Sequence, residues 1–489
     1  MNNLGLPTAL YRTEQIKILE QAVIQQGIIS GFELMERAGT AVFTCLKERY
    51  PVGKIAVFCG SGNNAGDGYV LATLALKAGM DVCVHAIAAT TGLQGDALTA
   101  YQHYINAGGV VTTFRTNVLI DAELVVDALF GTGLNRCVSD VYAQAIMCIN
   151  ESQLPVISID IPSGLNADTG DVMGYAIEAD VTATFIGLKR GLFTGFAAQH
   201  VGDIVYSSLD LPVETWKCVE ASVHRVLPKS LPTRHRYAHK GNYGHVLVIG
   251  GDIGYSGAAR LAGMAALRVG AGLVSIATHP ENAAVMNIAC PELMCHGIDT
   301  VSKLEPLLAK ASVIVVGTGL GQRDWAKALF DAALAKNKPL VIDADALNLL
   351  AQSPCKKDNW ILTPHVGEAA RLLDLTTRDI QGNRFNAVQA LQEAYGGVVL
   401  LKGAGTLIAS DDSITVSNTG NPGMASGGMG DVLSGVIAGL VAQGLSLQEA
   451  AQQGVYGHGF AADKAVEIDG ERGLLASDLL PHLKRWVNR

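Results

Sequence analysis

Short apolar runs that end in glycine or aspartate recur along this chain, and each is followed by a helical pattern. The first half contains KIAVFCG (54–60), AELVVDALFG (122–131) and LPVISIDIPSG (154–164). The second half contains GHVLVIGG (244–251), ASVIVVGTGLG (311–321), KPLVIDADAL (338–347), NWILTPHVGE (359–368) and GGVVLLKGAGT (396–406). Such runs are typical of parallel strands buried on both faces, with crossover helices between them. The pattern predicts two α/β layer structures.

The strand and helix rhythm lapses after about residue 211, in a stretch rich in proline, histidine and basic residues. We therefore predict a first domain over residues 1–215, a linker over 216–240 and a second domain over 241–489. A chain of 489 residues has room for two good-sized cores. No fixed short repeat is present, which argues against a solenoid.

Composition narrows the class of protein. Hydrophobic residues make up 49% and charged residues 17%, which favours compact folding over disorder. The net charge of −9 argues against general nucleic-acid binding, so small molecules are the expected ligands. Nine cysteines without a CxxC pair favour buried reduced thiols over a disulfide framework or a zinc site.

No segment of the chain predicts a membrane span or a secretory leader. The N-terminus lacks a basic segment followed by an apolar core. The most apolar run, VLSGVIAGLVAQGL (432–445), is short and interrupted by Ser434 and Gln443, so we predict a buried helix there. A cytoplasmic location is the resulting expectation.

The loop GSGNNAGDG (60–68) follows a strand and opens a helix, so its free amides suit a phosphate while Asn63, Asn64 and Asp67 offer polar side chains. It lacks the GKS/T ending of a Walker loop and matches the dinucleotide fingerprint only loosely. A plain glycine-rich turn is an equal alternative.

Two further strand ends are expected beside that loop, and they place Asp127, Asp160 and Ser163 there. Asp160 stands before Ile161-Pro162, which favours an extended backbone and a carboxylate that points outward as a general acid or base. The alternative for Asp127 and Asp160 is N-capping of the following helices. Asn64, Asp127 and Ser163 together offer hard oxygens that suit a monovalent or alkaline-earth cation.

In the second half, a strand ends in Lys402, Gly403, Ala404, Gly405 and Thr406. These residues offer amides, an ammonium and a hydroxyl to a phosphate-bearing ligand. A plain hairpin with a glycine turn is the alternative.

The stretch GNPGMASGGMGD (420–431) presents bare backbone at the entrance of an apolar helix, where the free amides favour a phosphoryl group. Asp431 follows Gly430 in the first turn and is placed to take a proton from a hydroxyl that attacks phosphorus. Complementing the helix dipole is the alternative role. His365 is a substrate partner or a capping side chain, and Asp343 and Asp345 are metal or water ligands or helix caps; these alternatives stay open.

Taken together, GNNAGDG, VDALFGTGL, DIPSGLNADTG, GGDIGYSGAA, TPHVGE, KGAGT and GNPGMASGGMGD closely resemble the bifunctional NAD(P)H-hydrate repair enzymes, in order and over nearly the whole chain. The resemblance implies a Rossmann-like, three-layer αβα epimerase domain followed by a ribokinase-like, ADP-dependent dehydratase domain. The family usually has glycine where this chain has Ala65, which affects only the fine geometry of the turn.

By this resemblance the first half interconverts the R and S epimers of NADHX and NADPHX, which are hydrated at C6 of the nicotinamide ring. Asp160 is the implied catalytic residue, and Asn64, Asp127 and Ser163 are the implied potassium ligands. The implied substrate contacts are Asp160 together with Asn63, Asn64, Ala65, Gly66, Asp67, Gly131, Thr132, Gly133, Leu134, Asn135, Arg136 and Cys137.

The second half is implied to dehydrate the S epimer to NAD(P)H, with ADP phosphorylating the C6 hydroxyl so that phosphate leaves. The resemblance places Ala258, Gly319, His365 and Asp431 at the hydrate, with Asp431 catalytic, and Lys402 to Thr406 with Gly430 at the nucleotide. Magnesium is expected at the phosphates, although no dedicated ligand set is readable. The family also implies a homo-oligomer, tetrameric or larger.

A second enzyme class remains open from the residues alone. A ribokinase-like alcohol kinase fused to a non-catalytic, Rossmann-like binding module shares the glycine-rich loop and Asp431.

Overall fold

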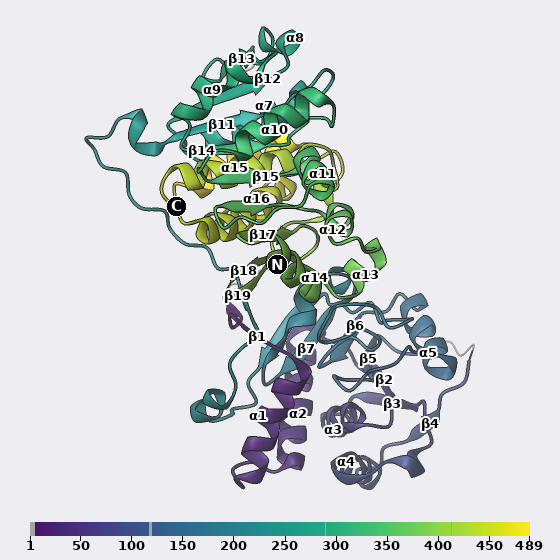
Figure 1. The fold of residues 1–489 in the computed structure, drawn as a ribbon. Coiled ribbons are helices and arrows are strands. Elements are labelled where there is room, and N and C mark those ends of the chain that lie inside the picture. Colours follow the sequence, from purple (N-terminus) through teal and green to yellow (C-terminus); the bar gives the residue numbers. More distant parts are fainter. Residues whose placement is uncertain (1–4, 117–119, 289, 412) are drawn as a thin grey trace. The chain divides into compact units, whose positions relative to one another are not determined.

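The chain forms two compact units, residues 1–224 and 225–489, in the computed structural model shown in Figure 1. The structure describes residues 5–116, 120–288, 290–411 and 413–489. The division between the units lies inside the predicted linker 216–240, which also contains the short strand β10 (Val223–Arg225). The exact bounds 1–215 and 241–489 stay a prediction.

A parallel sheet forms the centre of the first unit, with strand order β4-β3-β2-β5-β6-β7-β9. Its strands are β2 (Lys54–Cys59), β3 (Asp81–Ala86), β4 (Val111–Thr113), β5 (Leu124–Ala128), β6 (Val156–Ile159), β7 (Val181–Phe185) and β9 (Asp203–Ser207). The predicted strands at 54–60, 122–131 and 154–164 are therefore present and parallel. The order of the strands reverses direction at β2, so the loops after β2 and β5 diverge there and leave a crevice at their carboxyl ends.

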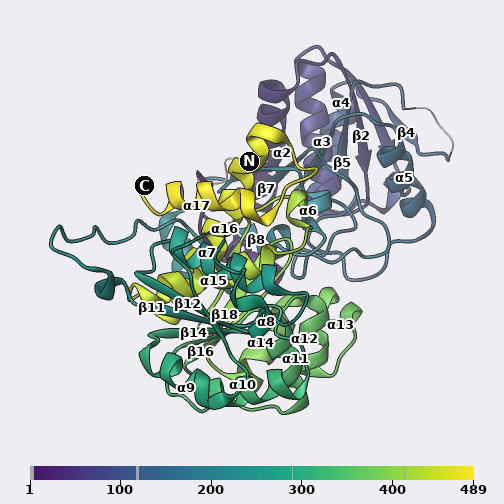
Figure 2. The same ribbon diagram turned by 90° about the horizontal axis from the view of Figure 1, so that it is seen from above.

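Helices cover both faces of this sheet, as Figures 1 and 2 show. Ile55 and Val57 of β2 pack in the core with α2, α3 and α4, whereas Ala56 and Phe58 pack with α5. This alternation produces the predicted three αβα layers. The helices are α1 (Thr13–Gln25), α2 (Gly31–Arg49), α3 (Asn63–Lys77), α4 (Gly95–Asn106), α5 (Asp140–Glu151) and α6 (Ala197–His200).

A second, small strand group in the first unit places one buried lysine. Strand β1 (Ala9–Tyr11) runs parallel to β8 (Leu188–Lys189) and antiparallel to β10. Lys189 pairs with Tyr11 in this arrangement and is only 1% exposed.

The sheet of the second unit runs in the order β13-β12-β11-β14-β15-β16-β17-β18-β19. Strands β13 to β17 are parallel in this order, whereas β18 and β19 add an antiparallel meander. The strands are β11 (His245–Ile249), β12 (Leu273–Thr278), β13 (Met294–Gly297), β14 (Val313–Val316), β15 (Leu340–Ile342), β16 (Trp360–Leu362), β17 (Val398–Leu401), β18 (Thr406–Ser410) and β19 (Ser413–Ser417). All five predicted strands of this half are present.

Two helical layers enclose that sheet as well. Helices α7, α15, α16 and α17 pack on one face, and α9 to α14 line the other (Figure 2). The helices are α7 (Ser256–Arg268), α8 (Pro280–Ala283), α9 (Val301–Lys310), α10 (Asp324–Leu334), α11 (Ala344–Gln352), α12 (Val366–Leu373), α13 (Thr377–Gly382), α14 (Arg384–Tyr395), α15 (Met429–Ala442), α16 (Leu447–Asp469) and α17 (Leu479–Trp486). Short 3-10 helices span Thr90–Gly92, Arg190–Phe193, Val213–Cys218, Lys240–Tyr243, Pro422–Met424 and Ala476–Asp478.

The apolar run at 432–445 lies largely in α15, whose residues from Val432 to Leu440 are buried, so the predicted buried helix is confirmed. Among the described residues, no helix has both the length and the apolar character needed to cross a bilayer.

The cysteines are free, but the expectation that they are buried is wrong for most of them. Only Cys45 and Cys59 are buried, whereas Cys137 and Cys218 are exposed. The nine cysteines are therefore reduced thiols, as expected, but most of them are not buried.

Candidate active sites

The loop after β2 forms one wall of a site in the first unit. Gly62 is the N-cap of α3, and the helix begins at Asn63, so the predicted loop-to-helix entrance is confirmed. In its first turn the amides of Ala65 and Gly66 already donate to the carbonyl of Gly62 at 3.0 and 3.4 Å, so only the amides before them are open to a ligand.

Asp127 lies inside β5 and is fully buried, so its predicted alternative role as an N-cap is wrong. Its carboxylate accepts hydrogen bonds from the hydroxyl of Ser163 at 2.6 Å, the hydroxyl of Ser158 at 2.8 Å, and the amides of Ser163 and Leu129 at 2.9 and 3.2 Å. Burial raises the pKa of Asp127, and these four donors oppose that rise by stabilising the charged form. The strand end is therefore a rigid, oxygen-rich corner.

Asn64 and Ser163 meet the loop after β5 at Phe130 and Gly131. The amide of Phe130 donates to the Ser163 hydroxyl at 2.8 Å. A Cβ on Gly131 would lie 3.3 Å from Oδ1 of Asn64, so only glycine leaves this approach uncrowded. The Nδ2 atom of Asn64 is buried and has no hydrogen-bond partner among the described residues. The structure thus gathers Asn64, Asp127 and Ser163 around one turn, as the sequence predicts.

Asp160 follows β6 with a left-handed backbone (φ +68°), so the expected extended conformation is wrong. The proline restriction acts on the residue directly before Pro162, which is Ile161 and not Asp160. Asp160 also caps no helix in the described chain; its Oδ1 instead forms an ion pair with Lys189. The Asp160 side chain is 15% exposed, which leaves its other oxygen directed at the adjoining cavity.

A cavity of about 600 Å³ lies against these residues. Most of the predicted substrate contacts line it: Asn63, Asn64, Asp67, Asp160, Gly131, Thr132, Gly133, Leu134, Asn135 and Arg136. Ala65 and Gly66 are buried in α3 behind this wall, and Cys137 lies beyond the lining loop. Asp127 and Ser163 lie beneath the wall and do not line it.

Sequence reasoning missed Lys189 and Glu20, which both line the cavity. Lys189 was open to detection, because a lysine that ends the apolar stretch VTATFIGL is expensive to bury without a charged partner. Glu20 carries no such signal, since it lies in an ordinary amphipathic helix and reaches the cavity only through the packing of α1.

In the second unit, carboxyl ends of β15 and β17 meet helix α15 at one ionic cluster. Lys402 donates to Oδ1 of Asp343 at 2.8 Å, and Ser434 donates to Oδ2 at 2.8 Å. Burial alone would raise the pKa of Asp343, but Lys402, Ser434 and Thr363 hold it below its ordinary value. Asp343 begins α11 without a side-chain capping bond, so the capping alternative is wrong for this residue.

Asp431 occupies the first turn of α15, as predicted. Burial, and then the negative charge of Asp343, raises the pKa of Asp431 to about 7, against the opposing effect of Lys402. Next to it, a Cβ on Gly430 would lie 3.4 Å from Nζ of Lys402 and 3.6 Å from Oδ2 of Asp343. The carboxyl of Asp431 is therefore poised to exchange a proton near neutral pH beside a fixed ammonium.

The loop before α15 leaves amides open at the same place. Gly428, the N-cap of α15, has φ +91°, and a Cβ there would lie 2.7 Å from Leu261, so glycine is required. No described residue accepts a hydrogen bond from the amides of Gly427, Gly428 or Gly430. These donors and the helix dipole form an anion-binding corner next to Lys402.

His365 caps α12, which confirms one of its two predicted roles. Its Nδ1 accepts from the amides of Gly367 at 2.9 Å and Glu368 at 3.3 Å. Burial and the nearby Lys402 lower the pKa of His365, and its Nε2 lies 3.5 Å from Oε1 of Glu368. Burial raises the pKa of Glu368 to about 7, 3.8 Å from Lys402, and sequence reasoning did not single out this carboxyl.

Lys402 to Thr406 form a hairpin turn between β17 and β18, so the alternative of a glycine hairpin is also structurally correct. The turn requires glycine at Gly403 (φ +140°), where a Cβ would meet the guanidinium of Arg384 at 3.1 Å. Arg384 is 1% exposed and donates to the carbonyl of Leu401 at 3.0 Å. This buried support of the turn was not foreseen, because nothing local in the sequence links α14 to the hairpin.

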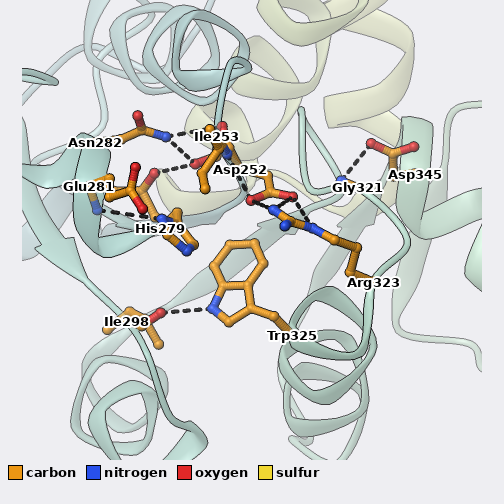
Figure 3. A network of polar contacts seen from close by, with 12 residues as sticks. Asp252, Ile253, His279, Glu281, Asn282, Ile298, Gly321, Arg323, Trp325 and Asp345 are labelled. Atoms are coloured by element: carbon orange, nitrogen blue, oxygen red, sulfur yellow. Dashed lines mark hydrogen bonds and ion pairs between the residues drawn. The ribbon is translucent and has the colours of Figure 1, made fainter.

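Ala258, in the first turn of α7, lies beside Gly319 in the loop after β14, since a Cβ on Gly319 would lie 3.1 Å from Cβ of Ala258. Beside them, Asp345 accepts from the Gly321 amide at 2.8 Å, so Asp345 braces this loop and does not cap α11 (Figure 3). Asp252, whose side chain is 6% exposed, holds the guanidinium of Arg323 from the other side. These contacts connect the loops after β11 and β14, where Gly319 lies, with the start of α11, next to Asp343.

Two family models cover these units. The model described as YjeF-related protein N-terminus matches residues 31–191, and the model described as NAD(P)H-hydrate dehydratase matches residues 246–485.

Individual relatives match over the full length. The bifunctional NAD(P)H-hydrate repair enzyme Nnr of Coxiella burnetii is 48% identical, over 98% of this chain and 100% of its own. The enzyme of the same description from Escherichia coli is 42% identical, over 100% of this chain and 95% of its own. A solved ribokinase-like superfamily protein from Enterococcus faecalis is 30% identical and covers 52% of this chain and 90% of its own, with a TM-score of 0.50.

Proposed function

The chain belongs to the bifunctional NAD(P)H-hydrate repair enzymes, and from that premise we propose how its two units divide the reaction. The first unit epimerises R- and S-NAD(P)HX at C6, and the second dehydrates the S epimer to NAD(P)H at the expense of ADP. Full-length similarity to bifunctional enzymes argues against the alternative of a simple alcohol kinase with an inactive partner domain.

The observation that carries the dehydratase proposal is the position of Asp431. Hydroxide is a poor leaving group, whereas a phosphorylated C6 oxygen leaves as phosphate, helped by the lone pair of the ring nitrogen. Asp431 takes the proton of the C6 hydroxyl as that oxygen attacks phosphorus. The open amides of Gly428 and Gly430 and the ammonium of Lys402 stabilise the charge on the transferring group.

The remaining predicted residues complete the ligand sites of this proposal. Lys402 to Thr406 and Gly430 bind the nucleotide, because the hairpin and the entrance of α15 present amides to one point. Ala258, Gly319, His365 and Asp431 contact the hydrate. In the first unit, Asp160 and the lining residues of the 600 Å³ cavity contact the R and S hydrates.

The oxygen donors of Asn64, Asp127 and Ser163 fit a potassium ion, which would supply positive charge beneath the substrate loop. Because Asp127 already accepts four hydrogen bonds, the ion would require the Ser163 hydroxyl to turn its proton away from Asp127. For magnesium, no group of three or more His, Cys, Asp or Glu side chains that could hold a metal ion exists among the described residues, so any such ion would depend on phosphate oxygens and water. A homo-oligomer, tetrameric or larger, also belongs to the proposal and is checked by light scattering.

An assay with pure S-NADHX tests the dehydratase proposal. With ADP, the absorbance of NADH should grow in step with phosphate release, and the same run with ATP tests the choice of donor. Accumulation of a stable phosphorylated alcohol in place of NADH would favour a kinase.

The pH dependence of dehydration should report Asp431. A base acts in its ionised form, so kcat/KM should fall about tenfold per pH unit below a pKa near 7 and level off above it. Initial rates from pH 5 to 9 measure this, and Asp331→Asn, which changes an exposed carboxyl on α10, should leave the profile unmoved. A profile that is flat through pH 7 would argue against Asp431 as the base.

Gly430→Ala should weaken nucleotide use. The added methyl would enter the space 3.4 Å from Nζ of Lys402 and 3.6 Å from Asp343, where the ion pair and the bound phosphate compete for room. We expect KM for ADP to rise about tenfold or more, which corresponds to about 1.4 kcal/mol. Gly427→Ala, with open space around its Cβ position, is the matched control.

A further inference from the structure

The cavity of the first unit contains several ionisable groups, and only Asp160 has been given a chemical role above. Asp67, Asp160, Glu20 and Lys189 all line the cavity of about 600 Å³, and they come from α3, the end of β6, α1 and β8. Four such groups from four separate elements are costly to assemble unless they serve chemistry.

Lys189 forms an ion pair with Asp160 and is itself 1% exposed. Its ammonium donates to Oδ1 of Asp160, to the hydroxyl of Thr184 at 3.1 Å and to the carbonyl of Phe185 at 2.9 Å, so all three of its protons are engaged. The ammonium is therefore held in place beside Oδ1 of Asp160 by its other two hydrogen bonds. Oδ2 of Asp160 has no hydrogen-bond partner among the described residues and faces the cavity.

Asp67 has the opposite environment. Its side chain has no hydrogen bond to any described residue, and it stands near the carboxyls of Asp160 and Glu20. Burial, followed by those two negative charges, raises the pKa of Asp67 well above its usual value, and the more distant Lys189 offsets this only in part. Burial and Asp160 also raise the pKa of Glu20. Asp67 thus faces the cavity in surroundings that favour its protonated form.

We propose that Asp67 and Asp160 are an acid and base pair that epimerises C6 by removing and re-adding its hydroxyl group, with Lys189 as the positioning residue of the base. This inference rests on the proposed epimerase function of the first unit. One carboxyl in an ion pair with a lysine and a second carboxyl without a positively charged partner among the described residues, both lining the same cavity, offer a base and an acid to one substrate.

The step balances without any reactant other than water. Asp67 gives its proton to the C6 hydroxyl, the C6–O bond breaks, and its electron pair leaves with the departing water. The lone pair of ring nitrogen N1 forms the C6=N1 bond of an iminium ion. A second water then adds to the opposite face of C6, N1 regains its pair, and Oδ2 of Asp160 takes the proton of that water.

One turnover leaves Asp67 ionised and Asp160 protonated, which is the form that converts the S epimer back by the reverse steps. Exchange of protons with solvent restores the starting form. Each epimerisation event must therefore replace the C6 oxygen with an oxygen from solvent.

The test uses the full chain with Asp431→Asn, so that dehydration does not consume the product, and R-enriched NADHX in ¹⁸O-labelled water. Mass spectrometry at low conversion, corrected for the uncatalysed reaction, should find one solvent oxygen in every newly formed S epimer. Adding Asp67→Asn should slow epimerisation by about a hundredfold or more, as expected for lost proton transfer. Asp81→Asn, which changes an exposed carboxyl on β3, should have no effect.

Retention of the original oxygen at the full enzymatic rate would overturn the proposal, since it requires ring opening at N1. Full epimerase activity in the Asp67→Asn variant would also overturn it. So would a loss of epimerase activity in the Glu20→Gln variant that the Asp67→Asn variant does not show. An unchanged melting transition of the first unit in the Asp67→Asn single variant, measured by calorimetry, confirms that this unit is folded. If the Asp431→Asn chain itself did not accelerate epimerisation, the proposed function of the first unit would fail, and the inference with it.

Discussion

Asp431→Asn should reduce dehydration of S-NADHX by about a hundredfold to ten-thousandfold, the usual contribution of a general base. Asparagine keeps the shape of the side chain but cannot accept the proton of the C6 hydroxyl. Because the partners of Asp343 are Lys402 and Ser434, the surrounding ion pair should remain intact. Stopped-flow and steady-state measurements of NADH formation with saturating ADP give the loss in kcat.

The control for this variant is the other half of the same chain, since R-to-S conversion should continue at the normal rate. The KM for ADP should change little, because amides and Lys402 bind the nucleotide. Dehydration that persists at more than about a tenth of the normal kcat would show that another group accepts the proton, and Glu368, with a pKa of about 7 beside Lys402, would be the first candidate.

Asp160→Asn should abolish accelerated epimerisation while leaving dehydration of pure S-NADHX intact. The change removes the only carboxylate in contact with the buried ammonium of Lys189 among the described residues. An unpaired buried charge typically costs about 3–5 kcal/mol, so the first unit should also melt at a lower temperature. Epimer ratios followed by chromatography, together with calorimetry, separate the chemical effect from the structural one.

The double variant Asp160→Asn with Lys189→Met is the matched control, since it removes both charges together. It should recover much of the lost stability without recovering epimerase activity. Equal loss of epimerisation and dehydration in a folded Asp160→Asn protein would contradict the division of labour between the units.

The fold was accessible from the sequence where strands are continuously apolar. Runs such as KIAVFCG and ASVIVVGTGLG became β2 and β14, because burial on both faces leaves no polar position in the pattern. The edge strands β4 (Val111–Thr113) and β13 (Met294–Gly297) were missed, since one side of an edge strand faces solvent and their segments are short and mixed. The inner strands β3, β7 and β12 and the antiparallel β19 were missed as well, because polar residues interrupt their apolar runs.

The candidate sites were predictable as far as they lie at strand ends. Parallel topology brings the carboxyl ends of neighbouring strands to one edge, so Asp127 and Ser163 meet, and so do Asp343 and Lys402. What local reasoning could not supply is the partner of each charge. An aspartate at the end of a strand and before a helix is predicted to cap that helix. Asp127 and Asp343 are instead buried and accept hydrogen bonds from residues distant in the sequence.

Some residues reach a site only because a distant helix packs against it, and no local sequence pattern predicts them. Arg384 supports the nucleotide turn from α14, and Glu20 enters the cavity from α1. Their positions depend on how whole helices pack against the sheets, which spacing along the chain does not encode.

The most direct test of the account gives the unmodified protein a mixture of R- and S-NADHX with ADP. We predict that both epimers disappear completely, at a rate above uncatalysed epimerisation, with one phosphate released for each NADH formed. A reaction that stops once the S epimer is spent, or that consumes ADP without forming NADH, would contradict it.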